Sequence, residues 1–139
     1  MSKIFIAALV ILSLVVVVSC KNQDAGAAEQ TESRSTAVYT KISPQAAKTM
    51  MDEQPGITVV DVRTLQEYEA GHIDGSINIP NETIGTSNVE TLPDLDATIL
   101  LYCRSGSRSS QAARKLIALG YTNVLDFGGI IDWPYEVVK

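Results

Sequence analysis

The residue of this chain whose surroundings suit it best for chemistry is Cys103. It follows the apolar run 98–102, and the next six residues are Arg-Ser-Gly-Ser-Arg-Ser. A cysteine attacks other atoms as its thiolate, which forms at neutral pH where positive charge or backbone N–H groups lower the pKa of the thiol. Small residues and arginines directly after a buried strand therefore predict a nucleophilic cysteine.

The loop after this cysteine is predicted to bind an anion. Glycine at position 106 permits a tight curl in which backbone N–H groups converge above the sulfur, and the positive end of the following helix extends this site. Two guanidinium groups add permanent positive charge that favours the thiolate and attracts an anionic substrate. The predicted anion-binding loop comprises Arg104, Ser105, Gly106, Ser107 and Arg108.

Several further motifs occur in an order that resembles the single-domain rhodaneses, from about residue 39 to residue 135. They are Val60-Asp61-Val62-Arg63, Glu67-Tyr68, Gly71-His72-Ile73-Asp74-Gly75-Ser76-Ile77-Asn78-Ile79-Pro80, the Cys103 loop, and Gly128-Gly129-Ile130 with Trp133. The resemblance implies an α/β fold, a three-layer domain whose mainly parallel central sheet is flanked by helices.

The same resemblance implies sulfur transfer in two half-reactions. The Cys103 thiolate takes the outer sulfur of a donor such as thiosulfate and becomes a persulfide, and cyanide, a small thiol or a protein thiol then accepts that sulfur. Arg108 and the loop N–H groups would hold the anionic donor, and Asp61 would support the loop. No metal or organic cofactor is implied.

The length of the loop separates this hypothesis from its nearest alternative. Four residues lie between Cys103 and Arg108, whereas the phosphatases and arsenate reductases of the related fold resemble a pattern with five. The shorter loop suits a sulfur atom better than a tetrahedral oxyanion. A phosphatase or arsenate reductase, and a non-catalytic domain that binds an anion or a partner, remain the alternative hypotheses.

The N-terminal residues have a different composition. Lys3 precedes an apolar run, which predicts a secretory signal over residues 1–19. The sequence Val17-Val18-Ser19-Cys20 resembles the lipobox of bacterial lipoproteins, and this resemblance implies cleavage before Cys20 and lipidation of its thiol. Residues 20–37, which are polar, predict a flexible tether. We therefore expect an extracytoplasmic protein, lipid-anchored to a bacterial cell membrane in the periplasm or at the cell surface.

Charge, length and cysteine content limit the hypotheses about partners, domains and disulfides. The chain has 139 residues and a formal net charge of −5, which argues against nucleic acid as its main partner. Residues 38–139 have a length typical of one compact domain. With Cys20 lipidated, Cys103 would be the only thiol of that domain and would have no intramolecular disulfide partner.

Apolar runs alternate with helical patterns along this domain. Strands are expected over residues 38–42, 57–62, 77–79, 99–102 and 124–127, and a loop with some helix over residues 81–96. The helix starts are predicted from Ser43-Pro44, from Thr64 with Glu67, and from Ser109 or Ser110.

Six further side chains are assigned structural roles. Asp61, at the end of a buried strand, requires a hydrogen-bond or ion-pair partner, and Arg63 with Glu67 is a candidate ion pair. His72 is expected in a turn that supports the sheet rather than as a base, and Trp133 with Tyr135 is expected to close the core.

Overall fold

The computed structural model describes residues 39–85 and 89–139. The predicted signal, lipidation site and tether lie outside these residues. No helix in the described ranges is both long enough and apolar enough to cross a membrane.

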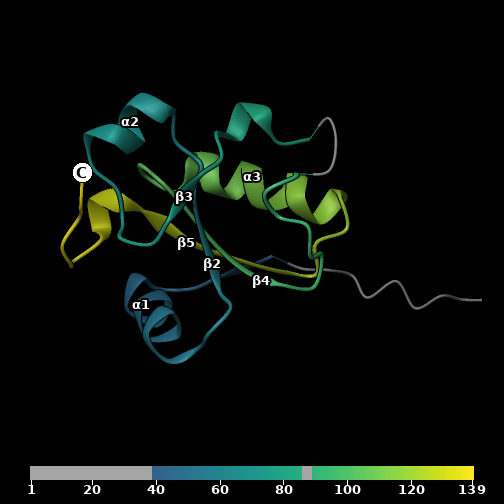
Figure 1. Cartoon of the computed structure of the whole chain (residues 1–139), viewed down its shortest axis with the longest axis horizontal. Helices are drawn as coiled ribbons and strands as arrows, with labels where there is room; N and C mark the ends of the chain where they lie inside the picture. Colours follow the sequence, from purple (N-terminus) through teal and green to yellow (C-terminus); the bar gives the residue numbers. More distant parts are fainter. Residues whose placement is uncertain (1–38, 86–88) are drawn as a thin grey trace, which may run out of the picture. The chain divides into compact units, whose positions relative to one another are not determined.

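The described residues fold around one sheet of five parallel strands, as the sequence predicts (Figure 1). The order across the sheet is β1-β5-β4-β2-β3. The strands are β1 (Thr40–Lys41), β2 (Thr58–Asp61), β3 (Ile77–Asn78), β4 (Thr98–Cys103) and β5 (Asn123–Gly129). β4 is buried in the middle of this sheet, and its carboxyl end delivers Cys103, where ligands bind in parallel α/β sheets.

Helices cover both faces of the sheet, which gives the three layers expected. Figure 1 shows α1 (Pro44–Glu53) on one side and α3 (Ser107–Ala118) with α2 (Leu65–Ala70) on the other. Short 3-10 turns follow at η1 (Asn81–Thr83), within the stretch predicted to be loop with some helix, and at η2 (Ile130–Asp132).

Two helix starts are confirmed and one lies earlier than predicted. Ser43 caps α1, and Thr64 and Glu67 form the predicted capping box of α2. The third helix, α3, begins at Ser107 rather than at Ser109 or Ser110. Gly106 is its N-cap, with φ +94°, so the chain turns from the loop directly into the helix without an intervening segment.

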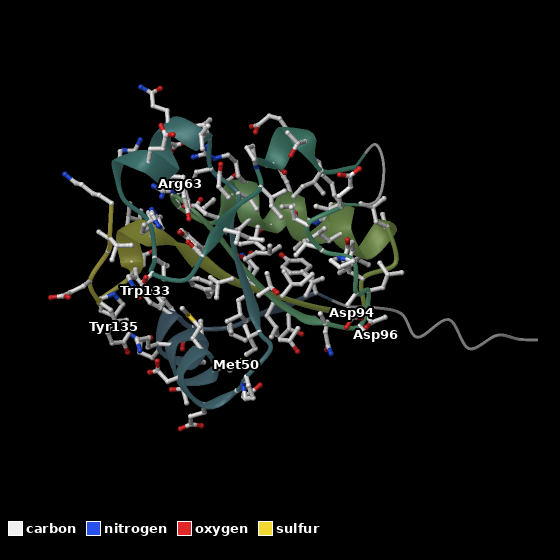
Figure 2. The ribbon with its side chains drawn as sticks, viewed as in Figure 1. Met50, Arg63, Asp94, Asp96, Trp133 and Tyr135 are labelled. Atoms are coloured by element: carbon white, nitrogen blue, oxygen red, sulfur yellow. The ribbon has the colours of Figure 1, made fainter. Side chains whose placement is uncertain are left out.

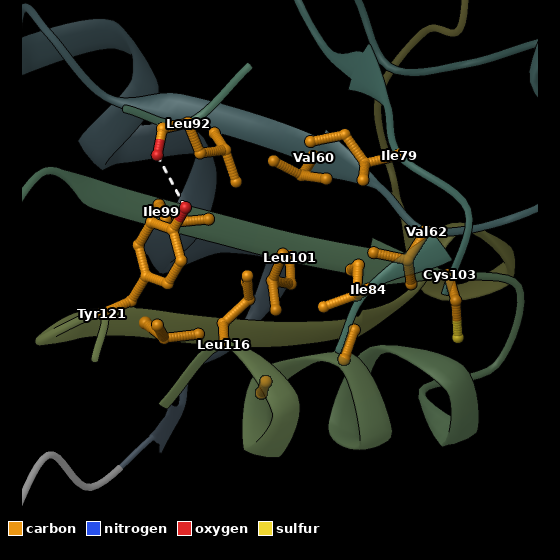
Figure 3. Close-up of a cluster of buried hydrophobic side chains, with 13 residues drawn as sticks. Val60, Val62, Ile79, Ile84, Leu92, Ile99, Leu101, Cys103, Leu116 and Tyr121 are labelled. Atoms are coloured by element: carbon orange, nitrogen blue, oxygen red, sulfur yellow. Dashed lines mark hydrogen bonds between the residues drawn. The ribbon is translucent and has the colours of Figure 1, made fainter. Parts of the chain in front are cut away.

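The core consists of two clusters, one on each face of the sheet. The cluster under α3 contains the side chain of Cys103 together with Val62, Ile84 and Leu116 (Figure 3). The cluster under α1 contains Tyr102, Phe127 and Trp133. The thiol therefore belongs to the α3 face of the sheet.

The pairing of β4 with β5 shifts by one residue at the end that bears the cysteine. Leu101 pairs with Asp126, but Cys103 pairs with Gly129. The additional residue lies in β5 next to Gly128, whose φ of +93° is costly for any residue other than glycine. The irregularity brings β5 and η2 against the loop that follows Cys103.

Candidate active site

Cys103 is buried, with 1% of its surface exposed, at the carboxyl end of β4. Its Sγ accepts a hydrogen bond from the Gly106 N–H, with an N···S distance of 3.0 Å. On the other side the sulfur adjoins the apolar cluster that includes Val62 and Ile84 (Figure 3). The sulfur thus has polar donors from the loop and an apolar wall from the core.

The pKa of the Cys103 thiol lies below its ordinary value. Burial raises this pKa, but hydrogen bonds from the N–H and hydroxyl of Ser109 and from the N–H groups of Ser105 and Gly106 outweigh burial. The Ser109 hydroxyl has one proton, which it can also donate to Gly106 O at 3.1 Å or to Gly128 O at 3.4 Å. A thiolate attracts this proton more strongly than a carbonyl does, so the hydroxyl favours the charged sulfur.

Glycine in β5 allows the Cys103 loop to lie close to the neighbouring strand. A Cβ at Gly129 would lie 2.4 Å from Arg104 O and 2.7 Å from the Cα of Ser105. The Ile131 N–H donates to the same Arg104 oxygen at 3.3 Å. The glycine at position 129 therefore allows the loop backbone to lie against β5.

Arg108, which the sequence predicts to hold an anion, forms an ion pair within the protein. Its two terminal nitrogens donate to the two carboxylate oxygens of Glu67, at 2.6 and 2.8 Å. This hydrogen-bonded pair lowers the pKa of Glu67 to about 2, against the opposing effect of burial. The predicted pairing of Glu67 with Arg63 is wrong, because Glu67 in α2 pairs with α3 instead.

The other members of the predicted loop differ in their surroundings. Arg104, Ser105 and Ser107 are exposed, while Gly106 is half-buried. Within the two described ranges, Arg104 has no carboxylate at ion-pair distance. Arg104 is therefore the guanidinium of the loop that carries an unbalanced charge.

Asp61 is fully buried and has a partner, as expected, although that partner is not the Cys103 loop. Its carboxylate accepts both Nε and Nη2 of Arg63, at 2.6 to 3.0 Å, and the Arg63 N–H at 2.9 Å. Arg63 also donates to Gly71 O at 2.7 Å, so this pair joins the ends of β2 and α2. Figure 2 labels Arg63 in the region below α2.

Three side chains expected in structural roles differ in burial: Trp133 is buried, whereas Tyr135 is 41% exposed and His72 is half-buried in a bridge with the C-terminal segment. His72 stacks on Tyr68, and its Nδ1 lies 3.0 Å from Tyr68 O, while its backbone pairs with Val138. Trp133 is buried against Phe127, and Tyr135 packs edge-on to Trp133 (Figure 2).

Three residues contribute to the site through contacts that the sequence does not predict. Ser109 was considered only as a helix start, although it is fully buried and directs its hydroxyl to the loop. Asp126 accepts Gly128 N–H and the Ser110 hydroxyl, each at 2.9 Å, and so joins β5 to α3. Glu67 lies 41 residues before Arg108, and no local pattern links two residues so far apart.

Comparison with known proteins places this arrangement in a family. The model of the rhodanese-like domain matches residues 43–134. The chain belongs to the rhodanese-like family.

Curated relatives of this rhodanese-like chain are named sulfurtransferases. It is 36% identical over 80 residues to the thiosulfate sulfurtransferase PspE of Escherichia coli, covering 58% of this chain and 77% of the relative. It is also 36% identical over 91 residues to the thiosulfate sulfurtransferase GlpE of Pseudomonas entomophila, covering 66% and 80%. The chain is a rhodanese-type sulfurtransferase.

Solved structures agree with the fold of this rhodanese-like domain. A structure described as a rhodanese with anions from E. coli has a TM-score of 0.55 and 35% identity, and covers 60% of this chain and 98% of that one. A rhodanese-related protein from Thermoplasma volcanium has a TM-score of 0.60 and 31% identity, with 72% and 98% covered.

Proposed function

We propose that Cys103 carries a sulfur atom as a persulfide, between a sulfane-sulfur donor such as thiosulfate and a thiophilic acceptor such as cyanide or a thiol. The observation that carries this proposal is the lowered pKa of Cys103, which results from N–H and hydroxyl donors gathered at its sulfur. A buried thiol without such donors would remain protonated and unreactive.

In the first half-reaction the Cys103 thiolate attacks the outer sulfur of the thiosulfate dianion. The new S–S bond forms as the bond to the SO3 group breaks, so the products are a Cys103 persulfide anion and a sulfite dianion. In the second half-reaction cyanide attacks the outer sulfur and leaves as thiocyanate, which returns the thiolate. A thiol acceptor would leave as a persulfide by the same exchange.

The loop would stabilise the charge that moves during these steps. The Gly106 N–H already lies 3.0 Å from the sulfur, and the loop continues into the amino end of α3, where backbone N–H groups favour negative charge. The role of Arg108 in this scheme is to hold the start of α3 against Glu67 rather than to contact the donor.

The test of this function is formation of thiocyanate from thiosulfate and cyanide by the reduced chain. We expect turnover in the parent protein and in Cys20→Ser, and none in Cys103→Ser. A chain that makes no thiocyanate but hydrolyses a phosphate ester or reduces arsenate would contradict the proposal and favour the first alternative. Anion binding without any turnover would favour a binding domain.

We also propose that Cys20 bears a lipid that anchors the domain at the outer side of a bacterial cell membrane. The support is the sequence of residues 1–20, with its apolar run and lipobox-like end. Two or more acyl chains provide stable anchoring where a single chain does not. Expression with a labelled fatty acid should label the parent protein and not Cys20→Ala, and equal labelling of both would contradict this proposal.

A further inference from the structure

The charge of Arg108 is already balanced within the protein. Both terminal nitrogens bind the Glu67 carboxylate in parallel, at 2.6 and 2.8 Å, which is the bidentate geometry of a strong ion pair. About a quarter of the Arg108 side chain and 30% of the Glu67 side chain are exposed, so the pair is only partly screened by water.

Glu67 is held in place from its own side as well. Its Oε2 accepts the N–H and the hydroxyl of Thr64, each at 3.1 Å, in the capping box of α2. An incoming anion therefore cannot displace the carboxylate without breaking the cap of the helix. Glu67 is a fixed negative charge beside the guanidinium that the loop would otherwise offer to a substrate.

Two further negative groups act on Arg108. The Cys103 thiolate and Glu82 in η1 both add to the attraction that Glu67 exerts on this guanidinium. Lys115, a cation further along α3, is bound elsewhere: its Nζ donates to Asn81 O at 2.6 Å and so joins α3 to η1. Three negative groups therefore act on Arg108, while Arg104 is the guanidinium of the loop that has no carboxylate partner in the described residues.

We propose that Glu67 sets the donor specificity of the Cys103 site: by holding Arg108, it disfavours dianionic thiosulfate relative to persulfide donors that carry at most one negative charge. This inference rests on the proposed function, and it deepens that function by naming the class of donor. Glu67 acts through Arg108 and is therefore a positioning residue.

The reaction with a persulfide donor balances without a further reagent. The Cys103 thiolate attacks the outer sulfur of R–S–SH, the S–S bond of the donor breaks, and R–S⁻ leaves. Cys103 becomes the persulfide Cys–S–SH, which keeps the donor's proton. A single negative charge is present before and after the step, whereas the step with thiosulfate brings a dianion to a thiolate.

The test compares two donors in two variants of α2. Glu67→Gln removes the charge while keeping a side chain that forms a capping box, and Glu69→Gln removes the same charge from an exposed position of the same helix. The donors are thiosulfate and the persulfide of N-acetylcysteine amide. The readout is kcat/KM for each donor, with KM and kcat separated, at low and at high salt.

We expect Glu67→Gln to raise kcat/KM for thiosulfate by about tenfold, mainly through KM, as removal of one nearby like charge allows. In the same variant, kcat/KM for the persulfide should change less than about twofold. In Glu69→Gln, kcat/KM for either donor should also change less than about twofold, since an exposed charge without this contact is largely screened. An unchanged ratio of donors in Glu67→Gln, or the same change in Glu69→Gln, would overturn the inference.

A second measurement needs no variant. If Arg108 is balanced by Glu67, added salt should lower kcat/KM for thiosulfate in the parent protein only slightly, because the site attracts the dianion weakly. A steep fall with salt would overturn the inference. If neither donor adds sulfur to the reduced parent protein, the proposed function fails and this inference with it. Normal sulfur loading with an unchanged donor ratio refutes the inference alone.

Discussion

At the scale of single residues, hydrogen bonds lower the pKa of Cys103. The groups that lower its pKa are the N–H groups of Ser105, Gly106 and Ser109 and the Ser109 hydroxyl. The guanidinium of Arg108 is bound to Glu67. A loop that curls around the sulfur can therefore stabilise the thiolate even where its arginine is paired elsewhere.

Ser109→Ala should raise the pKa of Cys103, because it removes the hydroxyl donor while leaving the backbone of α3 unchanged. The rate of alkylation by iodoacetamide, followed against pH on the peptide that contains Cys103, measures this pKa. Ser107→Ala is the matched control, since Ser107 is exposed in the first turn of the same helix. Equal pH profiles for the parent protein and Ser109→Ala would show that the hydroxyl does not lower the pKa of Cys103.

The sequence predicts Cys103 as the candidate nucleophile, and the structure places it at the carboxyl end of β4, but the sequence did not predict the partners of the charged residues around it. Cys103 was identified because its signals are local: a buried strand, small residues and a helix start within a few positions. The partner of Arg108 depends on how α2 packs beside α3, which no spacing along the chain reports. The same reason explains why Arg63 was assigned to Glu67 when it binds the nearer Asp61.

At the scale of elements, the loop after β4 is shaped by β5. Gly129 has an extended φ of −116°, which any residue adopts, so its importance is steric. A side chain there would overlap the backbone of Arg104 and Ser105. The glycine pair of β5 and the cysteine loop of β4 therefore form one structural unit.

Gly129→Ala should remove most sulfurtransferase activity, because the added methyl group must push the loop backbone away from the sulfur. Gly56→Ala is the control: it strains a left-handed residue, φ +87°, where a Cβ has no neighbour within 4 Å. The control should lose about 1 to 2 kcal/mol of stability and keep its specific activity. Full activity in folded Gly129→Ala would contradict the steric account.

The ion pair between Glu67 in α2 and Arg108 in α3 should make the free energy of unfolding depend on pH in the acid range. The pKa of Glu67 falls from 4.5 to about 2 on folding, so its stabilising effect is fully present above pH 4.5 and is lost as pH falls toward 2. Denaturant titrations across this range should show a smaller acid-dependent loss in Glu67→Gln than in the parent protein. Parallel curves would contradict the pairing.

The buried pair at the end of β2 should contribute far more to stability than an exposed pair. Asp61→Ala leaves the charge of Arg63 buried without a partner, which typically costs about 3 to 5 kcal/mol. Asp52→Ala breaks the exposed pair with Lys48 and should cost less than about 1 kcal/mol. Thermal unfolding of both variants measures the difference, and equal shifts would contradict the structural role given to Asp61.

At the scale of the whole molecule, the strands and two of the helix starts were predictable because each has its own sequence pattern. The five strands follow from apolar runs, and the caps of α1 and α2 follow from Ser43-Pro44 and from Thr64 with Glu67. The three-layer arrangement was expected from the family resemblance. The start of α3 was misplaced because a left-handed glycine as N-cap has no side-chain signal. The one-residue shift in the pairing of β5 with β4 could not be predicted from apolar periodicity either. A bulge becomes apparent only when the two strands are aligned.

The central claim is that this fold presents one cysteine as a sulfur carrier. The most direct measurement is the intact mass of the reduced chain before and after exposure to a sulfur donor, with thiosulfate and the persulfide of N-acetylcysteine amide tried in turn. We predict a gain of one sulfur atom that cyanide or a thiol removes, present in Cys20→Ser and absent in Cys103→Ser. No gain with either donor, or a gain that persists in Cys103→Ser, would contradict the account.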